Sequence, residues 1–308
     1  AMSDQEVIDI VEDVSVYARV APEQKLRLVE ALQTRGNIVA MTGDGVNDAP
    51  ALKRANIGVA MGITGTDVAK EAADMVLTDD NFASIEAAVE EGRGTFDNLT
   101  KFIVWTLPTN IGEGLVILAA IFAGVTLPIL PVQILWINMT TAVLLGLMLV
   151  FEPKEPGIME RMPRDPKEPI LTRTLMWRIA IVGCLLLLGA FGLFKYELLT
   201  GAGVAEARTV AVNLFVMGEL FYLFNCRSLT KSFFEIGFFS NPWVFGGAGL
   251  MFVLQLLFSY VPVMNTALHS SPIGLGAWLR VLAAASLIMV IVGMEKRFVQ
   301  RNNMKIKA

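Results

Sequence analysis

Two carboxylates four residues apart, Asp44 and Asp48, lie in a glycine-containing turn within residues 41–50. The turn follows the apolar run 38–41, which predicts a short buried strand. It precedes residues 49–53, which predict the start of a helix. Carboxylates at the end of a strand, where glycine allows a close backbone approach, suit a Mg²⁺ ion held against a phosphate. An acidic turn can also be a solvated loop, so the longer pattern around it matters.

The ten-residue string Met41–Pro50 resembles the hinge motif of the P-type ATPases, ATP-driven cation pumps built on a haloacid-dehalogenase-like phosphorylation domain. Residues 18–25, 56–62 and 79–82 also resemble that family, so the similarity extends along the chain. In the family, the lysine that matches Lys25 steadies the phosphoryl group, a reaction that depends on positioning and charge neutralisation. A surface lysine on an amphipathic helix is the alternative for Lys25 taken alone.

The resemblance implies a role for each residue of the catalytic region. Asp44 is expected to ligate Mg²⁺ and Asp48 to support the metal site. Asn47 is expected to contact the phosphate, while Thr42 and Gly43 shape the loop. ATP is the implied substrate.

The composition excludes an ordinary soluble domain. Of the 308 residues, 54% are apolar, and the excess lies beyond residue 100, where long apolar runs dominate. The net charge of −4 gives no basic surface for nucleic acid. The two cysteines have no metal-binding or disulfide spacing.

The first hundred residues predict an α/β domain with a parallel sheet, because short apolar runs alternate with helical patterns. A helix is expected from Pro22 to about Gln33. The expected strands are 14–18, 38–41, 57–61 and 74–77.

A helical pattern from Ser84 continues into the first of six apolar runs, each long enough or nearly long enough to cross a bilayer. The fourth run is the weakest, since Asn213 and Glu219 interrupt it. The six expected spans are 101–125, 127–151, 175–199, 209–224, 243–263 and 277–292.

Basic residues are concentrated in the loops after the second and fourth spans and after the sixth. The opposite loops carry few of them. The positive-inside rule therefore places both ends of the chain in the cytoplasm, in a multi-pass protein that we expect in the plasma membrane.

Polar side chains within spans are costly, so they are candidates for function. Asn110 and Glu113 are three apart and share a helical face, just after Pro108. An ionised Glu113 or Glu219 in a span needs a cation or a proton. The alternative is that such groups hydrogen-bond between helices, which we accept for Thr140.

Residues 109–113 and 135–141 resemble the segments from which calcium pumps take their ion ligands. The resemblance implies that the transported cation is bound by Asn110, Glu113, Asn138, Thr141 and Glu219. Where calcium pumps carry an aspartate after the matching threonine, this chain has Ala142. Because Ca²⁺ takes six to eight oxygen ligands, this difference argues against transport of two Ca²⁺ ions.

The nucleophile of the family lies in an Asp-Lys-Thr-Gly-Thr string, which these 308 residues do not contain. The resemblance thus implies the carboxyl-terminal part of a pump. Residues 1–97 would complete the phosphorylation domain and stalk, and residues 98–308 would form a six-helix cation-transport domain. The expected partners are the cation, the lipid bilayer and the amino-terminal part of the same pump.

Other functions remain open at this level. The cation could be a divalent ion such as Ca²⁺, which the resemblance favours, or Mg²⁺, a monovalent ion or a proton. A membrane-anchored phosphatase of the haloacid-dehalogenase type is a second hypothesis, although an anchor has no use for carboxylates in its spans. A non-catalytic regulatory paralogue is a third.

Overall fold

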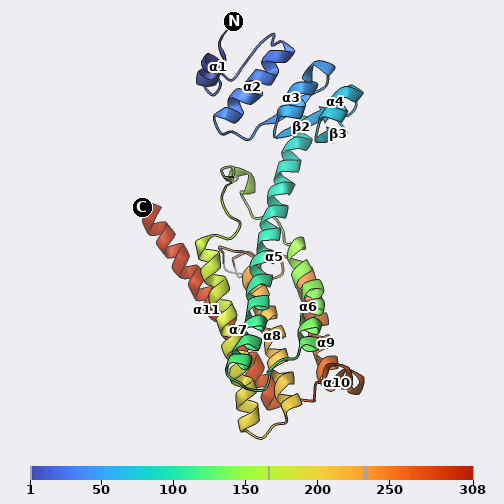
Figure 1. Ribbon diagram of the computed structural model, residues 1–308, viewed down its shortest axis with the longest axis vertical. Coiled ribbons are helices and arrows are strands. Elements are labelled where there is room, and N and C mark those ends of the chain that lie inside the picture. The colour runs from blue at the N-terminus through green and yellow to red at the C-terminus, as the bar shows by residue number, and fades with distance from the viewer. Residues whose placement is uncertain (1, 166, 232–234, 308) are drawn as a thin grey trace. The chain divides into compact units, whose positions relative to one another are not determined.

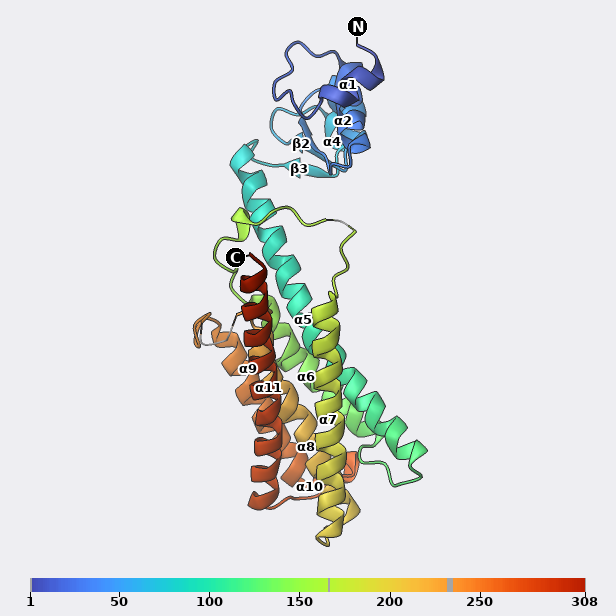
Figure 2. The same ribbon diagram turned by 90° about the vertical axis from the view of Figure 1, so that its left-hand side faces the viewer.

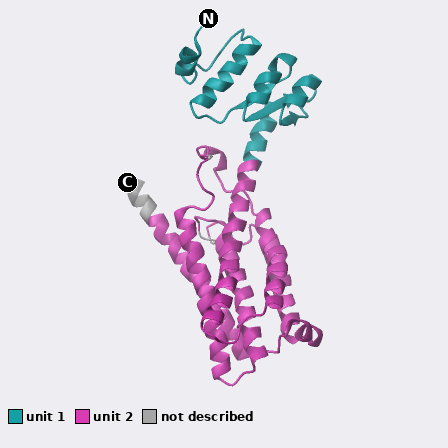
Figure 3. Cartoon of the chain, in the orientation of Figure 1, with its two compact units in different colours: residues 1–91 teal, residues 92–308 magenta. Residues whose placement is uncertain are grey.

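The computed structural model describes residues 2–165, 167–231 and 235–307. Its contacts divide the chain into two compact units, residues 1–91 and 92–308 (Figure 3). Helix α5 (Phe82–Phe122) begins in the first unit and ends in the second. The boundary expected between residues 97 and 98 lies within the same helix.

The first unit is an α/β domain. Its three strands form a parallel sheet in the order β1-β2-β3, with Ala40 opposite Ile57 and Val59 opposite Met75. The predicted parallel sheet is therefore confirmed. Its elements in chain order are α1 (Asp4–Ile10), α2 (Pro22–Thr34), β1 (Ala40–Gly43), η1 (Val46–Asp48), α3 (Ala49–Arg54), β2 (Ile57–Met61), α4 (Asp67–Ala72) and β3 (Met75–Leu77).

The strand predicted at residues 14–18 is wrong. The segment has no regular secondary structure and pairs with none of the described strands. The side chain of Val16 is 81% exposed, and Arg19 has a φ of 56°, which turns the chain away from an extended path. An alternating pattern forms a strand only where a neighbouring strand accepts its hydrogen bonds.

The helices of this unit begin where local chemistry favours them. Pro22 occupies the first turn of α2, where a missing N–H costs nothing. The Thr66 hydroxyl caps α4 by accepting a hydrogen bond from the Ala69 amide at 3.3 Å. Val29 of α2 and Ala51 of α3 are buried together with Val39, just before β1, so the helices are anchored next to the strand that leads into the acidic turn.

The second unit is helical, and six of its helical segments are long and apolar enough to cross a membrane (Figures 1 and 2). The prediction of six spans is confirmed. After α5 the elements are α6 (Pro131–Leu144), η2 (Gly146–Phe151), η3 (Ile158–Glu160), α7 (Arg173–Leu199), α8 (Val204–Cys226), α9 (Pro242–Tyr260), α10 (Pro262–Leu268) and α11 (Leu275–Lys307). The second span differs from the prediction because its α-helix stops at Leu144 and continues as a 3₁₀ turn.

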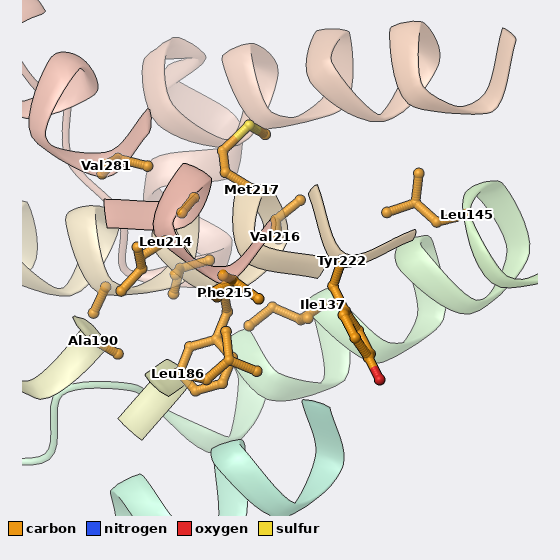
Figure 4. Packing of buried hydrophobic residues seen from close by; sticks show 14 of the residues in the cluster. Ile137, Leu145, Leu186, Ala190, Leu214, Phe215, Val216, Met217, Tyr222 and Val281 are labelled. Atoms are coloured by element: carbon orange, nitrogen blue, oxygen red, sulfur yellow. The ribbon is translucent and has the colours of Figure 1, made fainter. Parts of the chain in front are cut away.

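Helix α8 is the centre of this unit. Its mean hydropathy of 1.4 is the lowest of the six spans, yet 83% of its most apolar window is buried, against 28–39% for the others. It packs against α6, α7 and α11, and Phe215 and Tyr222 project from it into the apolar packing (Figure 4). Polar residues weaken its sequence signal because they face protein, not lipid.

A buried ion pair connects the loops at one end of the bundle. Arg227, just after α8, binds the carboxylate of Glu152 at 2.9 Å, and both side chains are almost completely buried. Asn241, the cap of α9, donates a further hydrogen bond to Glu152 at 2.8 Å. Because each charge has a partner, the cost of removing both from water is offset. The loops flanking α7 and α9 are thereby held against the end of α8.

The six spans predict how introduced cysteines will react. In a Cys184→Ser background, cysteines at the exposed positions Met162 and Arg301 should react with an impermeant thiol reagent from one side of the membrane. Cysteines at Gly203 and Thr266 should react only from the other side, because an even number of spans separates the members of each pair. Labelling of positions 162 and 301 from opposite sides would contradict this topology.

Candidate functional sites

The acidic turn is built around a close approach of two residues. A Cβ atom added to Gly43, at the end of β1, would lie 2.6 Å from the Cβ of Asp48, so only glycine fits there. The turn then continues through η1 into α3, and Pro50 occupies the first turn of that helix. The Asp48 side chain is therefore folded back beneath the loop, as the glycine in the motif suggests.

Both carboxylate oxygens of Asp48 have partners within the chain. Lys25 of α2 forms an ion pair with its Oδ1, and the amides of Asp44 and Gly45 donate to its Oδ2, each at 3.3 Å. Burial by itself would raise the pKa of Asp48. The hydrogen bond from Lys25 and those from the two amides outweigh it, so the pKa is lowered. The structure thus brings together two residues that are 23 positions apart.

Asp44 has a different environment. Its side chain is exposed, and no described residue forms a hydrogen bond or ion pair with its carboxylate. A carboxylate of this kind fits one ligand position of Mg²⁺, whereas both oxygens of Asp48 are already engaged. Asn47 is exposed next to it and Thr42 is half-buried at the end of β1. Of the residues in the turn, Asp44 is thus the one whose carboxylate could hold a Mg²⁺ ion.

The motif at residues 79–82 closes the loop after β2 and caps α5. Asp80 accepts hydrogen bonds from the amide of Ile63 at 3.0 Å and from the amide and hydroxyl of Thr64, each at 2.7 Å. These bonds lower the pKa of Asp80 to about 2. Asp79 accepts from the Ser84 hydroxyl at 2.6 Å, within the first turn of α5. In this structure the motif fixes the conformation of the loop after β2 and of the first turn of α5.

In the second unit, Glu113 of α5 and Asn138 of α6 meet. The Asn138 amide donates to Glu113 Oε2 at 2.8 Å, and Glu113 is only 3% exposed. This bond leaves the amide oxygen of Asn138 unused. The sequence predicted both residues as ligands, and the structure places them in direct contact.

Glu219 of α8 completes the group. It is 1% exposed, it interacts electrostatically with Glu113, and Thr141 of α6 lies beside it. The Thr141 hydroxyl donates its one proton to the Ile137 carbonyl at 2.9 Å, so it has none to donate to Glu219. Neither Glu219 oxygen, nor Glu113 Oε1, has a hydrogen-bond partner among the described residues. Buried polar atoms are normally paired, and three unpaired carboxylate oxygens are ligands that could hold a cation.

Two predicted positions differ from this group. Asn110 is exposed, although it is three residues from Glu113 on the same helix, and it does not join the cluster within the described chain. Ala142 is half-buried next to Thr141 and adds no oxygen. No group of three or more His, Cys, Asp or Glu side chains suited to a metal occurs in the described part of the chain. The cluster thus contains two carboxylates, one amide and one hydroxyl.

Two aromatic residues near the carboxylates were not foreseen from the sequence. Pro108 has no N–H, so the carbonyl of Val104, four residues earlier, lacks its helical partner. The Tyr222 hydroxyl of α8 donates to this carbonyl at 3.0 Å. Trp105 of α5 donates in turn to the Glu219 carbonyl at 3.0 Å. The proline inside a span was the available signal, since its orphaned carbonyl must find a donor.

The comparisons with known families agree with this arrangement. Residues 126–298 match the family described as cation transporting ATPase, C-terminus. The chain belongs to the P-type cation-transporting ATPases. Residues 3–56 match the haloacid dehalogenase-like hydrolases, as expected for part of the phosphorylation domain of this family.

Curated relatives in the P-type family are similar over nearly all of this chain. The Probable cation-transporting ATPase F of Mycobacterium tuberculosis is 62% identical over 295 residues, which are 96% of this chain and 33% of that protein. The Calcium-transporting ATPase of Bacillus subtilis is 43% identical over 289 residues, 93% of this chain and 32% of that protein. This chain spans about a third of the length of these relatives.

The ion pair in the acidic turn leads to a test by pH. Asp48 has a lowered pKa in the folded state, so it contributes stability above its unfolded pKa of about 3.9, and this is lost as the pH falls through the folded pKa. Lys25→Met leaves the burial in place and removes the charge, so the loss should begin at a higher pH. At neutral pH we expect a loss of about 1 kcal/mol.

The measurement is hydrogen–deuterium exchange of residues 40–50 at several pH values, corrected for intrinsic exchange rates. Lys53→Met, at an exposed position on α3, is the matched control and should change the opening free energy by less than about 0.5 kcal/mol. Equal pH profiles for the two variants would show that Lys25 does not stabilise the charged form of Asp48.

Proposed function

We propose that the full-length protein is an ATP-driven pump that moves a cation across a membrane through an aspartyl-phosphate cycle. The observation that carries the proposal is the burial of two carboxylates, Glu113 and Glu219, of which only Glu113 accepts a hydrogen bond, from Asn138 of α6. The other three carboxylate oxygens have no hydrogen-bond partner among the described residues. Carboxylates this deep in a bundle are costly unless they compensate a positive charge. A desolvated cation supplies that charge.

The chemistry of the site favours a divalent ion such as Ca²⁺. Two carboxylates match a charge of +2, and the amide oxygen of Asn138 and the hydroxyl of Thr141 are further hard ligands. Ala142 supplies no third carboxylate that two ions could share. We therefore propose one divalent ion per cycle, and Mg²⁺, a monovalent ion or a proton are the alternative cargoes.

The first unit would supply part of the phosphoryl-transfer site. When Mg²⁺ is bound, it neutralises charge on the phosphoryl group. Asp44 would hold it with its free carboxylate. Lys25, fixed by Asp48, would present a positive charge beside the phosphate, and Asn47 would contact the phosphate. The aspartate that accepts the phosphoryl group would lie outside this chain.

Helix α5 is the proposed mechanical link. It begins five residues after β3 and continues to Phe122, past Glu113. A change at the phosphorylation site that moves α5 would displace Glu113 relative to Glu219. The bonds from Tyr222 and Trp105 would transmit this displacement to α8. We propose that both chain ends lie in the cytoplasm, with the protein in the plasma membrane.

The other two hypotheses, an anchored phosphatase and a regulatory paralogue, explain fewer of these features. An anchored phosphatase would need spans but no buried carboxylates without partners. A regulatory paralogue could keep the ion site and would lack phosphorylation, so the presence of the Asp-Lys-Thr-Gly-Thr string in the full-length protein separates it from a pump.

Glu113→Gln tests the ion site in the full-length protein. An amide compensates a desolvated cation less well than a carboxylate does, so the half-activating cation concentration should rise about tenfold or more, which corresponds to ~1.4 kcal/mol. Phosphorylation from inorganic phosphate should persist, because Glu113 takes no part in that chemistry. The measurements are cation-stimulated ATPase activity and labelling with phosphate.

Glu206→Gln is the matched control, since Glu206 lies in the first turn of α8 and outside the cluster. It should leave the cation dependence unchanged. If Glu113→Gln behaves like this control, Glu113 has a structural role and the proposed ion site is wrong.

Ala142→Asp tests the choice of ion. Residue 142 is four residues from Asn138 on α6, so an aspartate there would share a helical face with it and adjoin Thr141. We expect tighter half-activation by Ca²⁺ or a larger number of bound Ca²⁺ ions, measured by ⁴⁵Ca²⁺ binding. Ala142→Asn, which adds a side chain of similar shape without charge, should do neither. Lower turnover with no gain for Ca²⁺ would favour a monovalent cargo.

A further inference from the structure

A second group of buried polar side chains lies between α8 and α9. Asn213 of α8 donates from its amide to the Ser259 hydroxyl of α9 at 3.0 Å and to the Thr209 carbonyl at 2.9 Å. Asn213 and Glu219 are six residues apart on α8, so they point to different faces of the helix. The group is therefore separate from the carboxylates of the proposed ion site.

Gln255 extends this group along α9. It lies four residues before Ser259, on the same buried helical face. Asn213 and Gln255 are both 0% exposed. The Asn213 Oδ1 atom and both polar atoms of the Gln255 amide have no hydrogen-bond partner among the described residues. Among the described residues, the buried faces of α8 and α9 thus carry two unpaired acceptors and one unpaired donor group.

These atoms are too deeply buried to form hydrogen bonds with bulk solvent. Unpaired amides in the interior of a protein are destabilising, and the surrounding bilayer offers no partner. A water molecule can donate two hydrogen bonds and accept two, so it suits a mixture of acceptors and donors. A metal ion suits it less well, because the Gln255 NH₂ group is a donor and the group contains no carboxylate.

We propose that Asn213, Gln255 and Ser259 form a buried site between α8 and α9 that binds ordered water. The bound water joins α9 to the central helix through hydrogen bonds that the side chains do not make directly. This inference does not rest on the proposed transport function, and its test does not use ATPase activity.

The sign of a stability change tests the site. In the full-length protein in lipid nanodiscs, Gln255→Met replaces the amide with an apolar chain of similar length. If the amide binds water, the variant loses those hydrogen bonds, and the melting temperature should fall by about 1 °C, because the shift per kcal/mol becomes smaller as a protein becomes larger. If the amide is dry and unpaired, the same replacement removes a destabilising group, and the melting temperature should rise or stay the same. A rise or no change overturns the proposal.

Gln133→Met is the matched control. Gln133 of α6 is also 0% exposed, but its amide is bonded directly to protein, donating to the Leu268 carbonyl at 2.9 Å and accepting from the Leu130 amide at 3.0 Å. Its replacement should lower the melting temperature whichever reading of Gln255 is correct. The control shows that the assay detects the loss of one buried amide.

Two further measurements keep the proposal falsifiable where a variant does not fold. A density map of the unaltered protein should show water within hydrogen-bond distance of both Asn213 Oδ1 and the Gln255 amide, and a continuous dry contact there would overturn the proposal. The difference in melting temperature between the unaltered protein and Gln255→Met should be the same in K⁺, Na⁺ or choline chloride at equal ionic strength. A dependence on K⁺ or Na⁺ that disappears in Gln255→Met would replace water with a monovalent cation.

Discussion

The burial of polar and charged side chains inside the helical bundle, away from bulk solvent, is the constraint on which the rest of this structure depends. Two carboxylates, Glu113 and Glu219, are buried there without direct partners for three of their four oxygens. Helix α8, the most polar span, is also the most buried one, because its polar groups are tolerated only where protein surrounds them. The arrangement of the other helices around α8 follows from the need to shield these groups from lipid.

The same constraint explains the backbone around the carboxylates. Pro108 interrupts the hydrogen bonding of α5 one turn before Glu113, and Tyr222 supplies the donor that the Val104 carbonyl has lost. Without such a donor, a proline in a span would leave a buried carbonyl unpaired. This donor belongs to α8, the helix that also carries Glu219. The proline in α5 and the position of the second carboxylate are therefore coupled through this bond and through the bond from Trp105 to the Glu219 carbonyl.

Buried carboxylates are treated in opposite ways in the acidic turn and at Glu113 and Glu219. In the acidic turn, Asp48 is neutralised within the chain by Lys25 and by two backbone amides, so the loop is fixed and Asp44 remains free. In the bundle, Glu113 and Glu219 have no cationic side chain as a partner among the described contacts. An internal partner gives a rigid loop, whereas unpaired carboxylates give a site whose stability depends on what binds to it. This contrast is what the proposed function requires, since the loop would be fixed and the cation would be exchanged.

The sequence by itself determined the six spans, the three parallel strands of the sheet and the acidic turn, because each follows from run length, alternation or close spacing along the chain. It also named Glu113 and Asn138 as candidate ligands on separate spans, and the tertiary structure joins them by a hydrogen bond. Only the tertiary structure decided that residues 14–18 form no strand, since the alternating pattern cannot show whether a neighbouring strand is present. It alone placed Asn110 on an exposed face, paired Lys25 with Asp48 and joined Tyr222 to Val104. Burial and partner choice depend on which helices surround a residue, and that information lies in contacts between segments far apart in the chain.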